Sequence, residues 1–196
     1  MTQLSWFQAD PTTSLEMMDL LGVDLDDPVI DIGGGTSSFV EGLMARGFTD
    51  VTVLDVSRSA LSAVAARIGS TNRVHLVERD LLEWRPTRQY KLWHDRATFH
   101  FMVTSDHRGR YHHLMEETLA AGGGFIVATF AEDGPETCSG LPVARYTGDE
   151  LAAAMGESAS IVATRRELHV TPQGMEQPFT WIAGRLKPDQ AADPRS

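Results

Sequence analysis

The residues with the clearest chemical potential in this sequence are four carboxylic acids near the ends of predicted strands. Asp31 lies in a first apolar run, Asp55 ends a second, Asp80 follows a third and Asp95 closes a fourth. In a doubly wound sheet, ligands bind beyond the carboxyl ends of the strands. An acid at a strand end also caps a following helix, which is the alternative for each residue taken alone. Four acids in equivalent places favour one shared binding site.

A glycine turn follows the first of these strands. In segment 31–35, Asp-Ile-Gly-Gly-Gly, the glycines let the backbone turn sharply and let a ligand approach with no Cβ in its way. A dinucleotide fingerprint would need a small residue where Ser38 stands, and serine suits that position poorly. Asp55 lies 20 residues after Gly35, and a carboxylate there can accept hydrogen bonds from both ribose hydroxyls. The spacing predicts a cofactor that contains a nucleoside.

Alternating strand and helix patterns must position these residues. Apolar runs predict strands at 29–32, 51–56, 74–77, 91–95 and 125–130. Apolar residues at helical spacing predict helices at 13–21, 39–46, 60–68, 111–122 and 147–155. Such alternation implies right-handed βαβ crossovers and a parallel sheet that is covered on both faces.

The last third of the chain predicts a hairpin at the sheet edge. Two β-rich runs, 161–170 and 178–186, flank the turn 171–174. Capping-box patterns at 13–16 and 147–150 mark two helix starts. The predicted fold is therefore α/β, Rossmann-like and doubly wound, with a mostly parallel seven-stranded sheet and an antiparallel C-terminal hairpin.

Composition limits the class of protein and its partners. A chain of 196 residues is expected to form one domain, at 1–186, followed by a flexible tail at 187–196. The net charge of -10 opposes binding to nucleic acid and to anionic membranes. A single cysteine and the absence of a signal-like or membrane-spanning apolar run predict a cytoplasmic protein. Its oligomeric state cannot be read from the sequence.

The strand-end motifs resemble those of the class I S-adenosylmethionine-dependent methyltransferases. The family's first motif resembles segment 31–35, its ribose-binding acid matches Asp55, and its adenine-binding acid matches Asp80. A narrower likeness, over 92–101 and 133–142 together with Ser-Trp-Phe-Gln near the N-terminus, is to a group of small bacterial single-domain methyltransferases. The resemblance covers roughly the whole predicted domain.

The resemblance implies S-adenosylmethionine as the cofactor and S-adenosylhomocysteine as the product. The loop would orient the methionine part through Asp31, and the Leu81 amide would read the adenine edge together with Asp80. Trp6 and Phe7 would close over the site as a lid. The alternative is that they form a hydrophobic staple at the start of the first helix. The cofactor contacts that the resemblance implies come from Trp6, Asp31, Gly33, Gly34, Gly35, Asp55, Val56, Asp80, Leu81 and His94.

Methyl transfer from a sulfonium is an in-line displacement, so alignment of the acceptor matters more than acid–base chemistry. Where the acceptor must lose a proton, the candidate bases are His94, Asp95 and His100, and an imidazole suits proton removal near neutral pH. The alternatives are a packing role for His94 and a buried, satisfied imidazole for His100. We expect no metal, because His107, His112 and His113 lack a convincing ligand spacing.

The 16-residue segment 131–146 is predicted to be a long functional loop over the acceptor. Phe7, Phe99, Cys138, Arg145 and Tyr146 are the candidate substrate-binding residues. A surface thiol and simple loop anchoring are the alternatives for the last three.

These observations predict a methyltransferase that acts on a small-molecule acceptor. One alternative is a protein lysine methyltransferase, because the acidic chain would attract a cationic segment. A second is a non-catalytic module that binds the cofactor or its demethylated product.

Overall fold

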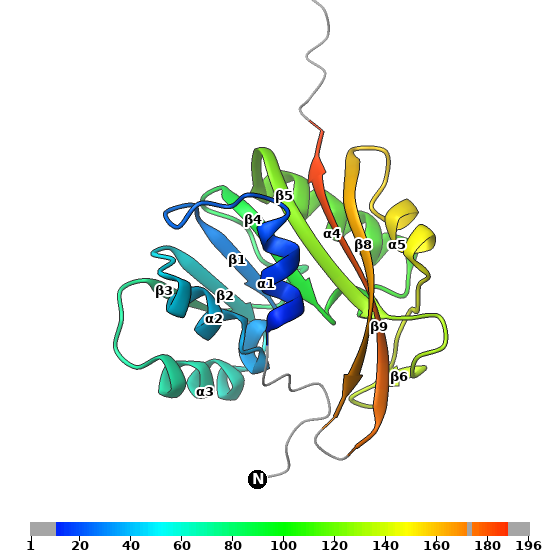
Figure 1. The fold of residues 1–196 in the computed structure, drawn as a ribbon, viewed down its shortest axis with the longest axis horizontal. Coiled ribbons are helices and arrows are strands. Elements are labelled where there is room, and N and C mark those ends of the chain that lie inside the picture. The colour runs from blue at the N-terminus through cyan, green and yellow to red at the C-terminus, as the bar shows by residue number, and fades with distance from the viewer. Residues whose placement is uncertain (1–10, 172–173, 188–196) are drawn as a thin grey trace, which may run out of the picture.

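The computed structural model describes residues 11–171 and 174–187. Seven strands form one sheet in the order β3-β2-β1-β4-β5-β9-β8 (Figure 1). Strands β1 to β5 pair in parallel, whereas β9 is antiparallel to both β5 and β8. The strands are β1 (Val29–Ile32), β2 (Val51–Asp55), β3 (Val74–Glu78), β4 (Tyr90–Arg96), β5 (Leu119–Phe130), β8 (Ala159–Val170) and β9 (Glu176–Leu186). The predicted fold class and the hairpin at the sheet edge are confirmed.

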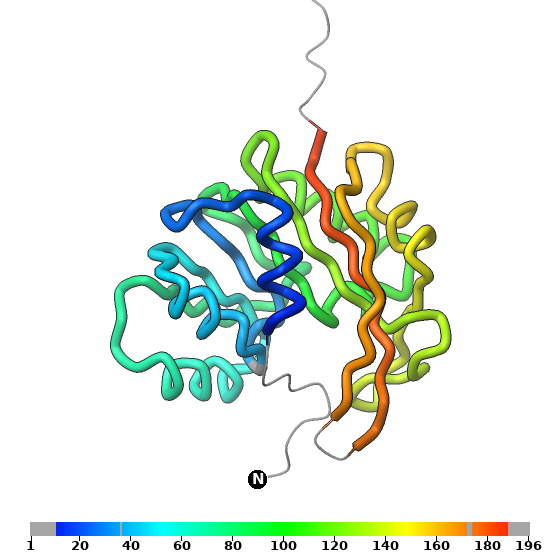
Figure 2. The backbone as a smooth tube through the Cα atoms, viewed as in Figure 1, coloured from blue at the N-terminus to red at the C-terminus, as the bar shows by residue number. Residues whose placement is uncertain are grey.

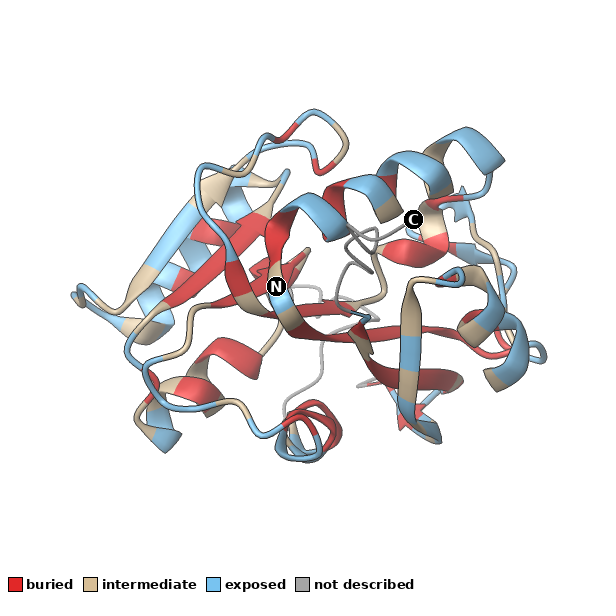
Figure 3. Ribbon diagram, turned by 90° about the horizontal axis from the view of Figure 1, so that it is seen from above, coloured by how far each residue is buried: buried red, intermediate tan, exposed pale blue. Residues whose placement is uncertain are grey.

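Helices cover both faces of this sheet. The helices are α1 (Thr12–Asp19), α2 (Phe39–Arg46), α3 (Arg58–Ile68), α4 (Ser105–Thr118) and α5 (Gly148–Ala154). Apolar residues of α1, α2 and α3 share one core cluster, and those of α4 and α5 share the other. Figure 3 shows the buried residues concentrated in the central strands and on the helix sides that face them. None of the described helices is long and apolar enough to span a membrane.

Two helix ends follow the sequence signals closely. Gly47 ends α2 with a φ of 98°, a conformation that glycine adopts without a steric penalty. Thr147 and Glu150 form the predicted capping box of α5, in which each side chain bonds the backbone N–H of the other.

The capping box predicted for the first helix is wrong. Helix α1 begins at Thr12 behind Pro11, and no side chain caps it. Thr13 instead donates to Glu167 at 2.9 Å, and Glu16 pairs with Arg165. The two side chains of the pattern therefore attach α1 to β8 rather than closing its first turn.

Two further boundaries differ from the prediction. Helix α4 ends at Thr118 rather than near Gly122, because Leu119 already pairs with Tyr90 in the sheet. The segment after β5 contains a two-stranded hairpin of β6 (Thr137–Cys138) and β7 (Leu141–Pro142), which has no apolar period in the sequence.

The long C-terminal hairpin lies beside β5. Strands β8 and β9, orange to red in Figure 2, run together along the side of the sheet opposite to β3. Thr171 and Gly174 bond across the turn that joins them, at 2.8 Å. Strand β9 pairs with β5, so the hairpin extends the sheet on the side away from β1.

Candidate functional site

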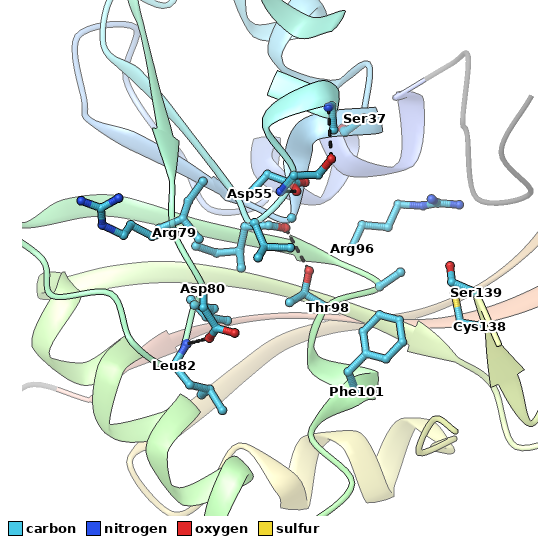
Figure 4. A pocket seen from close by; sticks show the side chains of 18 of the residues that line it. Ser37, Asp55, Arg79, Asp80, Leu82, Arg96, Thr98, Phe101, Cys138 and Ser139 are labelled. Atoms are coloured by element: carbon cyan, nitrogen blue, oxygen red, sulfur yellow. Dashed lines mark hydrogen bonds between the residues drawn. The ribbon is translucent and has the colours of Figure 1, made fainter. Parts of the chain in front are cut away.

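A pocket of about 660 Å³ opens at the carboxyl ends of β1, β2, β3 and β4 (Figure 4). Six residues predicted to form a site line it, namely Gly33, Asp55, Val56, Asp80, Leu81 and Cys138. Because parallel strands bring their carboxyl ends to one sheet edge, residues far apart in the sequence meet here.

The glycine turn forms one wall through its backbone. Gly33 has a φ of 66°, and a Cβ on it would lie 2.2 Å from Thr98 Oγ1. A Cβ on Gly35 would lie 2.5 Å from the Cβ of Ala60, at the start of α3. Only glycine at these two positions permits so close an approach.

Asp55 ties this turn to the next loop. Its Oδ2 accepts the Gly35 N–H at 2.9 Å, and its Oδ1 accepts the Ser57 N–H at 2.8 Å. Each carboxylate oxygen has a further lone pair, and the residue lines the pocket. Asp55 is thus held rigidly with acceptor capacity left for a ligand.

Asp80 lies at the same side of the pocket. Its Oδ1 accepts the Leu82 N–H at 2.8 Å, which fixes the carboxylate at the turn after β3. Leu81 beside it is buried and also lines the pocket. A planar ring with hydrogen-bond donors on its edge would find an acceptor and an apolar surface together here.

The opposite side of the pocket comes from the end of β4 and from the small hairpin. Arg96, Thr98 and Phe101 line it together with Cys138 and Ser139. Cys138 is buried, and burial raises the pKa of its thiol, so the thiol is neutral at physiological pH. The Arg96 side chain points away from Asp55 and toward the hairpin (Figure 4).

Asp31 and His94 lie outside the pocket lining, in the interior between β1, β4 and α1. His94 Nδ1 lies 2.6 Å from Asp31 Oδ1, and His94 Nε2 lies 2.9 Å from the Ser14 hydroxyl. The His94 ring also stacks on Phe39, with centroids 3.9 Å apart. Both side chains are fully enclosed, because strand alternation turns them under α1 rather than toward the strand end.

Asp95 points to the other face of the sheet and is also outside the lining. Its Oδ1 accepts the Thr98 N–H at 2.8 Å, and its Oδ2 accepts the Tyr111 O–H at 2.7 Å. The Trp93 indole N–H in turn donates to Tyr111 at 2.8 Å. Burial raises the pKa of Asp95 to about 7. These hydrogen bonds make Asp95 a structural link between the turn after β4 and helix α4.

His100 is buried behind the pocket wall. Its ring meets the rings of Phe101 and Phe130 at 4.5 and 4.9 Å between centroids. Within the described residues, neither ring nitrogen has a hydrogen-bond partner. Burial, aided by the charge of Arg96, lowers the pKa of His100 to about 3, so the imidazole is neutral at physiological pH.

Three predicted substrate-binding residues are placed away from the pocket. Phe99 is fully buried against Tyr111, with ring centroids 4.7 Å apart, and Tyr146 packs against Phe99 at 5.8 Å. Arg145 donates to the Gly134 carbonyl at 3.0 Å and to Glu136 at 3.2 Å, so it anchors its own loop. Trp6 and Phe7 lie outside the described residues.

Several residues of the lining are not among the predicted site residues. Three of these residues, Arg96, Thr98 and Phe101, lie in segment 92–101, which resembles small bacterial methyltransferases. That resemblance is the sequence signal that could have identified them. Helix α3 begins at Arg58, two residues before the predicted start at residue 60, and the Ser57 side chain caps it by accepting the Ala60 N–H. A serine at this position is a typical helix-start signal that the prediction did not use. Among the described residues, no group of histidines, cysteines and acids could hold a metal ion.

Comparison with known proteins shows which domains this chain resembles. Residues 29–123 match the family model of the methyltransferase domain. This segment is just under half of the chain, and over it the chain is similar to methyltransferase domains. Malonyl-(acyl-carrier protein) O-methyltransferase 2 of Ilyobacter polytropus is 28% identical over 123 residues, which are 60% of this chain and 46% of that protein. The match therefore spans about half of that relative's length.

Solved methyltransferases share the fold at low sequence identity. The 1,6-didemethyltoxoflavin-N1-methyltransferase of Burkholderia thailandensis, solved with bound 1,6-didemethyltoxoflavin and S-adenosylhomocysteine, has a TM-score of 0.72. It is 21% identical, and the likeness covers 90% of this chain and 77% of that one. The N-methyltransferase NodS of Bradyrhizobium japonicum with S-adenosylhomocysteine has a TM-score of 0.69 at 16% identity, covering 92% and 91%.

The lining of the pocket fits S-adenosylmethionine, the cofactor of the methyltransferases that share this fold. Asp55 keeps acceptor capacity that ribose hydroxyls could use, and Gly33 lines the pocket beside it. Asp80 and Leu81 supply the acceptor and the apolar surface that an adenine ring needs.

Proposed function

We propose that the protein transfers a methyl group from S-adenosylmethionine to a small-molecule acceptor. The observation that carries the proposal is Asp55, which bridges Gly35 and Ser57 and faces the same pocket as Asp80. When bound, S-adenosylmethionine supplies a methyl group already activated on a sulfonium. The protein then has to bind and orient both molecules.

Each side of the pocket has a separate task in this proposal. Asp55 and Asp80 hold the nucleoside, and the turn at Gly33 lets the methionine part lie against the backbone. Thr98 and Phe101 border the acceptor on the other side, where Phe101 also excludes water. No general base is assigned to His94 or Asp95, because the hydrogen bonds of both are used inside the protein.

A small acceptor is supported over a protein lysine. Arg96 lines the acceptor side, and its positive charge would repel a lysine ammonium group. The N-methyltransferases and the O-methyltransferase among the similar proteins act on different atoms, so the methylated atom is left open. We keep the cytoplasm as the proposed location, because one cysteine permits no disulfide within the chain.

Calorimetric titration tests the cofactor. The protein is expected to bind S-adenosylmethionine and S-adenosylhomocysteine but not NAD. Asp55→Ala is expected to lower the affinity for both ligands by at least about tenfold. Asp50→Ala removes a carboxylate that lies just before the same strand and pairs with Arg88, and this variant should bind both ligands like the wild type. Binding of NAD, or equal binding by Asp55→Ala, would refute the proposal.

Turnover separates an enzyme from a cofactor-binding module. The wild type is expected to form S-adenosylhomocysteine with at least one member of a panel of thiols, amines and hydroxyl compounds. Cofactor binding without turnover of any acceptor would favour the non-catalytic alternative. A labelled band after incubation of cell-extract proteins with methyl-labelled cofactor would favour the lysine alternative.

A further inference from the structure

Three buried polar side chains link helix α1 to the strand before the glycine turn. The Ser14 hydroxyl oxygen lies 2.9 Å from His94 Nε2, and His94 Nδ1 lies 2.6 Å from Asp31 Oδ1. Each of the three residues is at most 1% exposed. A carboxylate accepts hydrogen bonds, so Nδ1 donates to Asp31, and Nε2 can then accept the Ser14 O–H. This buried triad is outside the pocket lining and does not touch a ligand there.

His94 contacts the chain on both sides of the glycine turn. It lies opposite Asp31 in the pairing of β4 with β1, which is the strand that precedes the turn. Its ring also stacks on Phe39, the first residue of α2 after the turn, with ring centroids 3.9 Å apart. The position of this one ring therefore fixes the two ends between which the turn is formed.

The Asp31 carboxylate packs directly against the turn. A Cβ on Gly34 would lie 2.2 Å from Asp31 Oδ2 and 2.5 Å from its Cγ, so the carboxylate and the Gly34 backbone are in close contact. Asp31 Oδ2 has no hydrogen-bond partner among the described residues. The direction of the carboxylate therefore depends on the hydrogen bond that its other oxygen accepts from His94.

The other side of the same turn belongs to the pocket. Gly33 lines the pocket, and the Gly35 N–H donates to Asp55 Oδ2 at 2.9 Å. The turn is thus held between two carboxylates, that of Asp31 in the interior and that of Asp55 at the pocket. A shift of the Asp31 carboxylate would move the backbone to which Asp55 is bound.

We propose that Ser14 and His94 are positioning residues, which set the glycine turn for the part of the cofactor that lies against it. The inference rests on the proposed function. Removal of the Ser14 hydroxyl leaves His94 Nε2 without this partner in a closed interior, so the ring and the Asp31 carboxylate can shift. Packing of α1 and binding of a ligand at the turn then favour each other, because coupling between two sites is reciprocal.

Two neighbouring variants of α1 separate positioning from simple packing of the helix. Ser14→Ala removes the hydroxyl that bonds His94, whereas Thr13→Ala removes a bond from α1 to Glu167 and leaves the triad intact. Calorimetry measures the binding of S-adenosylhomocysteine and of 5′-methylthioadenosine, which lacks the amino-acid part. We expect Ser14→Ala to lower the affinity for S-adenosylhomocysteine at least about fivefold and that for 5′-methylthioadenosine less than about twofold. Thr13→Ala should bind both ligands like the wild type.

Amide NMR signals of Gly33, Gly34 and Gly35 test the turn in the protein without ligand. Ser14→Ala should shift these signals, because the turn packs on Asp31, and Thr13→Ala should not. A purely stabilising role of Ser14 would lower the unfolding free energy and leave both the affinities and the glycine signals unchanged.

Wild-type affinity in Ser14→Ala, an equal loss in Thr13→Ala, an equal loss for 5′-methylthioadenosine, or unchanged glycine signals would each overturn the inference. Failure of the wild type to bind S-adenosylhomocysteine would refute the proposed function instead. The glycine signals of the ligand-free variants would then still decide whether Ser14 positions the turn.

Discussion

A buried imidazole among aromatic rings gives the protein a specific sensitivity to acid. His100 is fully enclosed near Phe101 and Phe130, and its pKa is lowered to about 3 from an ordinary value of 6.5. Between these values the unfolded chain binds a proton that the folded chain does not, so stability falls as the pH drops below 6.5.

Replacement of His100 by phenylalanine should remove this dependence, because Phe fills a similar volume in an apolar place. Between pH 7.5 and pH 5 we expect the wild type to lose about 2 kcal/mol of unfolding free energy relative to His100→Phe. Urea denaturation at the two pH values measures this difference. Parallel losses in both proteins would show that the imidazole is protonated in the folded state or that other groups dominate.

Tyr111 joins two buried polar groups, so its hydroxyl should matter for stability. It donates to Asp95 and accepts from the Trp93 indole, and Tyr111→Phe leaves both without this partner. We expect a loss of about 3 kcal/mol.

The loss should be larger at pH 8 than at pH 5.5. Burial raises the pKa of Asp95 to about 7, and the Tyr111 O–H bond acts against that rise. The folded carboxyl is mostly protonated at pH 5.5 and mostly ionised at pH 8, so the variant has the greater deficit at the higher pH. Urea denaturation of both proteins would contradict this account if the loss were equal at the two values.

At the scale of elements, the capping box of α5 is predicted by the sequence and present in the structure. Thr147→Ala should cost about 1 kcal/mol of unfolding free energy, because the Glu150 N–H loses its side-chain acceptor. Thr147→Ser keeps the hydroxyl and should stay close to the wild type. Chemical denaturation compares the three proteins, and an equal loss in the serine variant would mean that the threonine methyl group, not the cap, stabilises α5.

The strand and helix order followed from the sequence because apolar periodicity depends on local burial. Which face of the sheet a strand side chain points to depends on the position of the strand in the sheet. That orientation determines which of the four acids reach the pocket. Asp55 and Asp80 lie at the strand end, whereas Asp31 and Asp95 are turned to opposite faces by the pleat. The Thr13–Glu16 pattern likewise predicts a capping box from local sequence alone. In the folded protein both side chains instead bind residues of β8, which are distant in the sequence.

For the whole molecule, the pocket connects segments that the chain keeps far apart. Its lining runs from Ile32 in β1 to Ser139 in the small hairpin and includes the start of α3. The β8–β9 hairpin lies on the side of the sheet opposite to β3 and contributes no described lining residue. A ligand in the pocket should therefore stabilise the protein unevenly.

S-adenosylhomocysteine at about 100 times its dissociation constant should raise the unfolding free energy by about 2.7 kcal/mol. Hydrogen exchange should slow in the turns after β1, β2 and β3 and at the start of α3, because Asp55 links Gly35 to Ser57 there. Exchange at the exposed edge of β8 should stay unchanged below the level of global unfolding. Asp55→Ala should lose both effects at the same ligand concentration. Equal slowing along β8, or slowing that persists in Asp55→Ala, would mean that the ligand binds elsewhere or acts on the fold as a whole.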